Sequence, residues 1–253
     1  MNGLPRSLRA LAAALVLSGL AAAPAAAADH PTIVELFTSQ GCTSCPPADA
    51  YLLDLVGRQD ADNLIVLGFH VDYWDYLGWA DTFGAPENTE RQRGYMQKMG
   101  LRSVYTPQMV VGGRYDVIGA DRNAVEQFLA AERAEVLPGP GDVWFDMQEG
   151  GLYLKVEAGE FEGVADVWLV VFGANEEVEI LRGENAGQTI TYGNVVHSVV
   201  RLGEWTGKYA DFAMPQFMYG GDDSGLGCVA LIQVRGHGAI VGAAQIPISI
   251  LAR

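Results

Sequence analysis

The strongest constraint on the fold is a change in the spacing of apolar residues at residues 138–141, which read Pro-Gly-Pro-Gly. Before this break, short apolar runs alternate with apolar residues at helical spacing, and after it strand-like runs are separated by glycines. Alternating strands and helices predict parallel strands covered by helices, whereas strands joined by short glycine turns predict antiparallel pairs. We therefore expect two domains, residues 29–137 and residues 142–253.

The first half is expected to be an α/β unit with the element order β-α-β-α-β-β-α. The run at residues 64–71 is apolar at nearly every position, as in a central parallel strand. Asp121 precedes an apolar stripe and can cap the last helix. Predicted strands lie at 32–37, 64–71, 108–111 and 114–118, and predicted helices at 48–56, at 85–99 and after residue 121.

The second half is expected to form a small antiparallel sheet or sandwich. Glycine pairs and a Gly-His-Gly segment at 236–238 are typical of hairpin turns. The alternative is a single domain in which these strands pack directly on the first sheet. Predicted strands lie near 142–148, 151–158, 164–172, 189–202, 227–235 and 239–250.

The first 28 residues have the pattern of a signal peptide. Arg6 and Arg9 precede an uncharged apolar stretch at 11–23, and alanines at 25–28 suit cleavage after Ala28. That stretch is shorter than the roughly 20 residues of a membrane span. We therefore expect a periplasmic or secreted protein without a stable membrane anchor after cleavage; the alternative is an uncleaved N-terminal anchor.

The charge balance argues against two classes of partner. The formal net charge is −15, and loss of Arg6 and Arg9 with the leader makes it −17. Nucleic acids and anionic membranes both require a basic face. The sequence thus predicts no nucleic-acid partner, and it leaves the oligomeric state open.

The motif with the clearest chemistry is GCTSCPP at residues 41–47, between the first predicted strand and the first predicted helix. Backbone N–H groups and the dipole at a helix start favour a thiolate. Two following prolines favour a helix that begins at Pro46 or Pro47, which leaves Cys42 in the turn before it. The spacing predicts Cys42 as the nucleophile and Cys45 as the resolving thiol of a disulfide-exchange pair.

Two families resemble this chain. Residues 32–134 are similar to the thioredoxin superfamily in the strand–CxxC–helix motif and in Thr106-Pro107 before the third strand. That resemblance implies a thioredoxin-like fold with an appended β-rich domain, and a cis-proline at Pro107 that faces the redox pair. A closer likeness is to a family of secreted proteins catalogued as a domain of unknown function. Its motifs here are VELFTSQGC at 34–42, DYWD at 72–75, LGW at 77–79, RQR at 91–93 and YTPQ at 105–108.

Taken together, these patterns predict an exported thiol–disulfide oxidoreductase that acts on protein thiols or disulfides without a cofactor. The predicted catalytic residues are Cys42, Cys45 and Pro107. The predicted substrate-binding residues are Thr106, Trp74 and Tyr73, because the aromatic segment after the second strand could form a rim around the pair. The alternative for this segment is a loop pinned by buried rings whose polar tips are hydrogen-bonded.

Two other functions use the same cysteines. The pair could be a permanent structural disulfide in a non-catalytic binding module. It could also bind copper or zinc together with His70 at the end of the second strand, although the four histidines show no paired spacing. The third cysteine, Cys228, lies in an apolar run and is expected to be buried as a small hydrophobe; the alternative is a thiol for exchange or dimer linkage.

Overall fold

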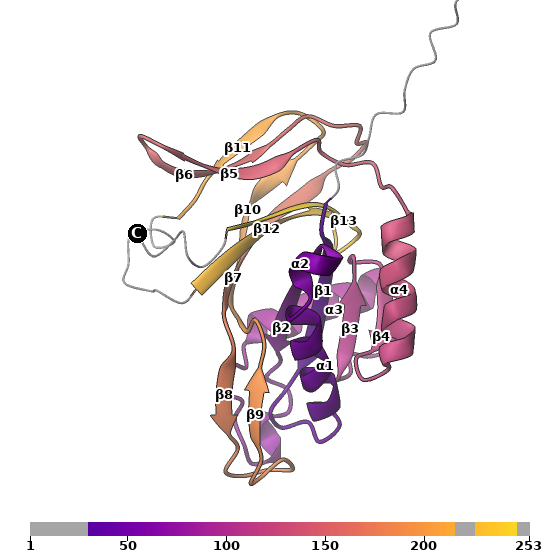
Figure 1. Ribbon diagram of the computed structural model, residues 1–253, viewed down its shortest axis with the longest axis vertical. Coiled ribbons are helices and arrows are strands. Elements are labelled where there is room, and N and C mark those ends of the chain that lie inside the picture. Colours follow the sequence, from indigo (N-terminus) through magenta and orange to yellow (C-terminus); the bar gives the residue numbers. More distant parts are fainter. Residues whose placement is uncertain (1–29, 216–225, 247–253) are drawn as a thin grey trace, which may run out of the picture.

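The computed structural model describes residues 30–215 and 226–246 (Figure 1). The expected leader, residues 1–28, lies outside the described residues. None of the described helices is both long and apolar enough to cross a membrane.

The first half of the chain forms a mixed four-stranded sheet in the order β2-β1-β3-β4. Strand β1 pairs parallel to β2 and antiparallel to β3, and β3 forms a hairpin with β4. Every residue of β1 and β2 is buried, as their apolar runs predict. The strands are β1 (Thr32–Thr38), β2 (Leu64–His70), β3 (Gln108–Val111) and β4 (Tyr115–Ile118).

The helices of this half cover both faces of the sheet. Apolar residues of α1 and α4 pack with Val34 and Leu36 on one face, and Tyr95 of α3 packs with Ile33 and Phe37 on the other. The predicted cap is confirmed, since the Asp121 side chain accepts a hydrogen bond from the Ala124 N–H. The helices are α1 (Pro46–Val56), α2 (Gln59–Asp62), the 3-10 helix η1 (Asp75–Leu77), α3 (Pro86–Met99) and α4 (Arg122–Ala134).

The described part of the second half forms three antiparallel sheets, in the orders β10-β7-β12-β13, β11-β6-β5 and β8-β9. The predicted strand at 189–202 is divided into β9 and β10, and two short strands, β8 and β11, were not predicted. The strands are β5 (Val143–Gln148), β6 (Gly151–Val156), β7 (Ala165–Gly173), β8 (Glu176–Glu179), β9 (Thr189–Tyr192), β10 (Val196–Trp205), β11 (Ala210–Ala213), β12 (Leu226–Val234) and β13 (Ile240–Ile246).

Strands β7 and β12 are buried on both faces, and one of these faces packs against the first half of the chain. Val170 and Val229 pack into the core that contains Ile33 and Phe37 of β1. Alternate residues of the same strands pack on the opposite side, with Leu154 of β6 among them. The sheet β10-β7-β12-β13 therefore lies between the first sheet and the sheet β11-β6-β5.

The expected fold class, a thioredoxin-like α/β domain with an appended β-rich domain, is wrong. The described part of the chain is mostly β, with 40% of its residues in strands and 22% in helices, and its strands form several sheets. The pattern of apolar residues predicts the order of strands and helices, but it cannot show which element covers each face of an apolar strand. Here the second-half strands pack directly on the first sheet. The division into residues 29–137 and 142–253 stays a prediction.

The edge strand β2 also meets the second half of the chain. The Gly68 N–H donates to the Asn194 carbonyl at 3.0 Å, and Gly68 forms an isolated parallel bridge with Val195. The Asn194 side chain donates to the Val66 carbonyl at 2.8 Å. A Cβ at Gly68 would lie 3.0 Å from the Gly193 carbonyl oxygen, so this close approach favours glycine.

Candidate functional site

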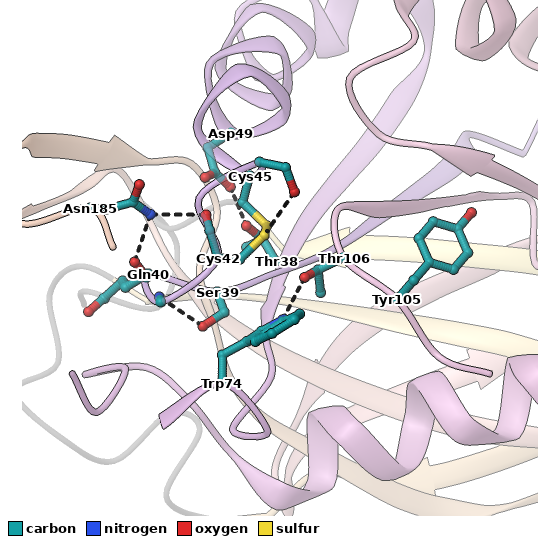
Figure 2. Close-up of a disulfide and its surroundings, with 12 residues drawn as sticks. Thr38, Ser39, Gln40, Cys42, Cys45, Asp49, Trp74, Tyr105, Thr106 and Asn185 are labelled. Atoms are coloured by element: carbon teal, nitrogen blue, oxygen red, sulfur yellow. Dashed lines mark hydrogen bonds between the residues drawn. A yellow bond between two sulfur atoms is a disulfide. The ribbon is translucent and has the colours of Figure 1, made fainter. Parts of the chain in front are cut away.

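The Cys-x-x-Cys motif lies in the loop between β1 and α1, and Cys42 and Cys45 form a disulfide (Figure 2). Helix α1 begins at Pro46 with Cys45 at its N-cap, so the predicted start is confirmed. Cys42 lies in the preceding turn, where its N–H donates to the Ser39 carbonyl and its carbonyl accepts from the Cys45 N–H, both at 3.1 Å. The turn thus holds the two sulfurs together ahead of the helix.

Both cysteines of the pair are buried. Cys42 is 3% exposed and Cys45 is 0% exposed. The Ser44 hydroxyl lies 3.4 Å from the Cys42 sulfur and is the polar group in contact with it. Cys42 is therefore the slightly more exposed of the two cysteines.

The predicted cis-proline is present, since the bond between Thr106 and Pro107 is cis. Gly119, which follows β4, lies between this proline and the first turn of α1. A Cβ at Gly119 would be 3.2 Å from the Ala48 Cβ and 3.4 Å from the Pro107 Cβ. Pro107 therefore lies near the first turn of α1, the helix that follows the disulfide.

Trp74 connects the proline segment to the cysteine loop. Its indole N–H donates to the Thr106 hydroxyl at 2.7 Å. Its Cβ would be 3.2 Å from a Cβ at Gly41, so a larger residue there would displace it. Tyr73 is tied to α3 through its hydroxyl, which donates to the Gln92 side chain at 3.1 Å. The polar tips of both predicted rim residues are thus hydrogen-bonded, while Tyr76, which stacks on Trp74, is 76% exposed.

A buried polar network that the sequence did not indicate is hydrogen-bonded to Gln40 in the cysteine loop. The Gln40 N–H donates to Asp81 Oδ2 at 2.8 Å, and the Gln40 side-chain carbonyl accepts from the Trp79 indole N–H, also at 2.8 Å. Asp81 in turn contacts His70 Nδ1 at 2.8 Å. Burial raises the pKa of Asp81, but His70 and the two backbone donors Gln40 and Phe83 outweigh burial and lower it below its ordinary value.

His70, the alternative metal ligand, is part of this network. His70 is 1% exposed and is engaged with Asp81 through Nδ1. Within residues 30–215 and 226–246, no group of three His, Cys, Asp or Glu side chains is placed to hold a metal ion. Metal binding through Cys42, Cys45 and His70 therefore gains no support from the geometry.

Asp49 is the buried acid closest in sequence to the pair. It lies one helical turn after Cys45, whose carbonyl accepts its N–H at 3.1 Å. Its Oδ1 accepts from the Thr38 hydroxyl at 2.7 Å, and its Oδ2 has no hydrogen-bond partner among the described residues. Burial raises the pKa of Asp49 to about 7, against the opposing effects of Thr38 and His70. Asp49 can therefore gain or lose a proton near neutral pH.

We expect Asp49→Asn to stabilise the oxidised protein at pH 8. The pKa of Asp49 rises from 3.8 to about 7 on folding, so the unfolded chain ionises first and wild-type stability falls as the pH rises between these values. The loss of unfolding free energy caused by Asp49 is constant above pH 7 and absent below about pH 4. Its upper limit is about 4 kcal/mol, at 1.36 kcal/mol per pKa unit. Urea unfolding at pH 4 and pH 8 measures it.

The control for this experiment is Asp54→Asn on the exposed side of the same helix, where the carboxylate pairs with Arg122. This variant should change stability little at either pH. An Asp49→Asn variant that differs from wild type equally at pH 4 and pH 8 would contradict the raised pKa.

Asn185, from the second half of the chain, also touches the cysteine loop. Its side-chain amide donates to the Gln40 and Cys42 carbonyls, each at 2.9 Å (Figure 2). No sequence pattern indicated this residue, which lies 143 positions after Cys42. The candidate site is therefore built from both halves of the chain.

Cys228 lies apart from this network, on β12. It is buried and free, and it packs in the core beside Leu154. Burial raises the pKa of its thiol to about 12. These observations fit the prediction of a small buried hydrophobe.

The fold and the site together define a mostly β protein in which a mixed sheet delivers an oxidised Cys-x-x-Cys pair to the start of a helix. The chain belongs to the family described as "Protein of unknown function (DUF1223)", whose model matches residues 33–233. The predicted likeness to a domain of unknown function is thus confirmed.

Two solved structures resemble the chain. Protein AGR_C_4864 from Agrobacterium tumefaciens is 35% identical, with a TM-score of 0.70; the match covers 87% of this chain and 94% of that one. HBP35 of Porphyromonas gingivalis is 12% identical, with a TM-score of 0.53 and coverage of 87% and 76%, and this likeness shows the fold alone. No curated protein matches the chain.

Proposed function

We propose that this protein is an exported thiol–disulfide exchange protein that uses Cys42 and Cys45. The observation that carries the proposal is the juxtaposition of an oxidised pair at the start of α1 with Asp49, a buried acid whose pKa is about 7. The cis bond before Pro107 gives further support, since the site resembles that of the thioredoxin superfamily. The leader pattern at residues 1–28 is consistent with export to an oxidising compartment.

The proposed reaction begins when a thiolate of a partner protein attacks the Cys42 sulfur. The S–S bond breaks, Cys45 leaves as a thiolate, and the protonated Asp49 carboxyl supplies the proton that makes it a thiol. A second thiolate of the same partner then attacks the partner sulfur of the mixed disulfide and releases the Cys42 thiolate. The partner loses two electrons and the pair gains them; the reverse sequence reduces a partner disulfide.

The partner would bind along the side of Cys42, where the aromatic residues and Thr106 meet. Tyr76 is exposed and stacks on Trp74, which contacts both Thr106 and the cysteine loop. An aromatic surface of this kind suits an extended peptide around a cysteine. We propose Thr106, Trp74 and Tyr73 as the residues that position it.

A structural disulfide in a non-catalytic binding module is the second candidate. It is favoured by the burial of the pair, since Cys42 is only 3% exposed and Cys45 is fully covered. Redox-active cysteines are ordinarily accessible on at least one sulfur. The two candidates differ in how readily the disulfide is reduced.

The reduction potential of the Cys42–Cys45 pair distinguishes them. We expect a value between about −120 and −270 mV, the span of exchange-active pairs. It can be measured by equilibration with glutathione or thioredoxin-range redox buffers, followed by alkylation and mass spectrometry. A pair that remains oxidised at potentials down to about −300 mV is a structural disulfide, and that result would remove the exchange proposal.

A further inference from the structure

The loop between β8 and β9, residues 180–188, places one side chain against the redox motif. Asn185 is 1% exposed, and its amide nitrogen donates to two carbonyls of the cysteine loop, those of Gln40 and Cys42, at 2.9 Å each. Both donor hydrogens of the amide are thus used on the motif. In Figure 2, Asn185 lies on the opposite side of the cysteine loop from Thr106.

The loop itself fixes the Asn185 side chain. Its Oδ1 accepts from the Gln188 side chain at 3.2 Å. The Ile180 N–H donates to the Gln188 carbonyl, and the Gly187 N–H donates to the Ile180 carbonyl. Trp79 packs beside Gly183 of the same loop and also bonds Gln40. The Asn185 amide is therefore held against the motif by hydrogen bonds within its own loop.

The Cys42 carbonyl lies in the turn between the two cysteines. It accepts from the Cys45 N–H and so closes the turn between the two cysteines. The Asn185 amide binds the same oxygen from outside. When the disulfide is reduced, the covalent link that holds this turn is lost, but the bonds from Asn185 can persist.

We propose that Asn185 is a positioning residue that sets the equilibrium between the dithiol and the disulfide, and that the β8–β9 hairpin is therefore part of the redox centre. This inference rests on the proposed function. Asn185 keeps the reduced turn ordered, so the two thiols remain close and the disulfide forms readily. Without the Asn185 bonds, the reduced loop gains conformational entropy, whereas the disulfide keeps the oxidised loop ordered.

Asn185→Ala should therefore lower the equilibrium constant for disulfide formation by about tenfold, which is the size expected for freeing roughly one residue of backbone. A tenfold change corresponds to a reduction potential about 30 mV less negative. The constant is measured for the full chain in glutathione buffers by alkylation and mass spectrometry. Asn185→Ser is the second variant, and its shorter hydroxyl side chain should also lower the constant.

Asn194→Gly is the matched control. Asn194 lies near the other end of the same hairpin, and its amide likewise donates to two acceptors, the Val66 carbonyl at 2.8 Å and the Gln59 side chain at 3.0 Å. Its φ of 45° suits glycine, and its side chain does not contact the cysteine loop in these bonds. This variant should weaken the attachment of the hairpin to β2 and leave the equilibrium constant within twofold of wild type.

A lowered constant in the two Asn185 variants, with little change in Asn194→Gly, supports the inference. An unchanged constant in Asn185→Ala or Asn185→Ser, or an equal decrease in the control, overturns it. The measurement needs no turnover. A wild-type pair that fails in an exchange assay would therefore remove the proposed function, whereas an unshifted constant would remove only the role of Asn185.

Discussion

Cys42→Ser should reduce turnover in a disulfide-exchange assay to below roughly one thousandth of wild type, the scale expected for loss of a covalent nucleophile. Cys45→Ser should retain the attack by Cys42 but fail to resolve the product, so it should accumulate mixed disulfides with its partner. The assignment follows from geometry, because Cys42 lies in the turn before α1 while Cys45 is fully buried at its N-cap. Non-reducing electrophoresis and mass spectrometry detect the trapped species.

Cys228→Ser is the control for these two variants. Cys228 is free and buried on β12, so its loss should change stability and leave turnover per folded molecule unchanged. Normal turnover by Cys42→Ser would refute the mechanism. Trapping by Cys42→Ser in place of Cys45→Ser would reverse the roles of the two cysteines.

Arg91→Ala should lower the free energy of unfolding by about 3–5 kcal/mol, the usual cost of removing one partner from a buried ion pair. Arg91 lies on α3, and its Nε donates to Glu35 Oε1 at 2.6 Å, where both side chains are buried. It also donates to the Gln233 side chain of β12 at 3.3 Å and to the Tyr95 hydroxyl at 3.1 Å. Its loss leaves the Glu35 carboxylate inside the core that joins the two halves.

Arg93→Ala is the matched control, on the same helix two residues later. Arg93 pairs with Glu90 at the surface, where an ion pair contributes about 0–1 kcal/mol. Urea unfolding of the oxidised proteins at pH 7 gives both values. If the two variants were destabilised equally, the buried network would not hold the halves together.

The local structure of the site was predictable, because short-range geometry determines it. A Cys-x-x-Cys motif between an apolar strand and a helical pattern places the pair at a helix start, and two prolines fix that start at Pro46. The cis-proline was predicted from the resemblance of Thr106-Pro107 to a known motif. These features depend on residues within a few positions of each other.

The fold class and the supporting residues were not predictable in the same way. The apolar runs of β7 and β12 indicate burial on both faces, but they do not identify the first sheet as the cover of one face. Strand β8 reads Glu-Glu-Val-Glu and is partly exposed, so its composition favours a loop. Asn185 is an ordinary polar residue in the sequence and becomes part of the site only through tertiary contact.

The bridge at Gly68 has a consequence for association between molecules. The outer side of an edge strand offers unpaired N–H and C=O groups that can recruit a strand from another molecule. On β2, the Gly68 N–H and the Val66 carbonyl are bonded to the backbone and side chain of Asn194. The chain thus shields its own sheet edge, and a change that releases this segment would offer β2 as a template for aggregation.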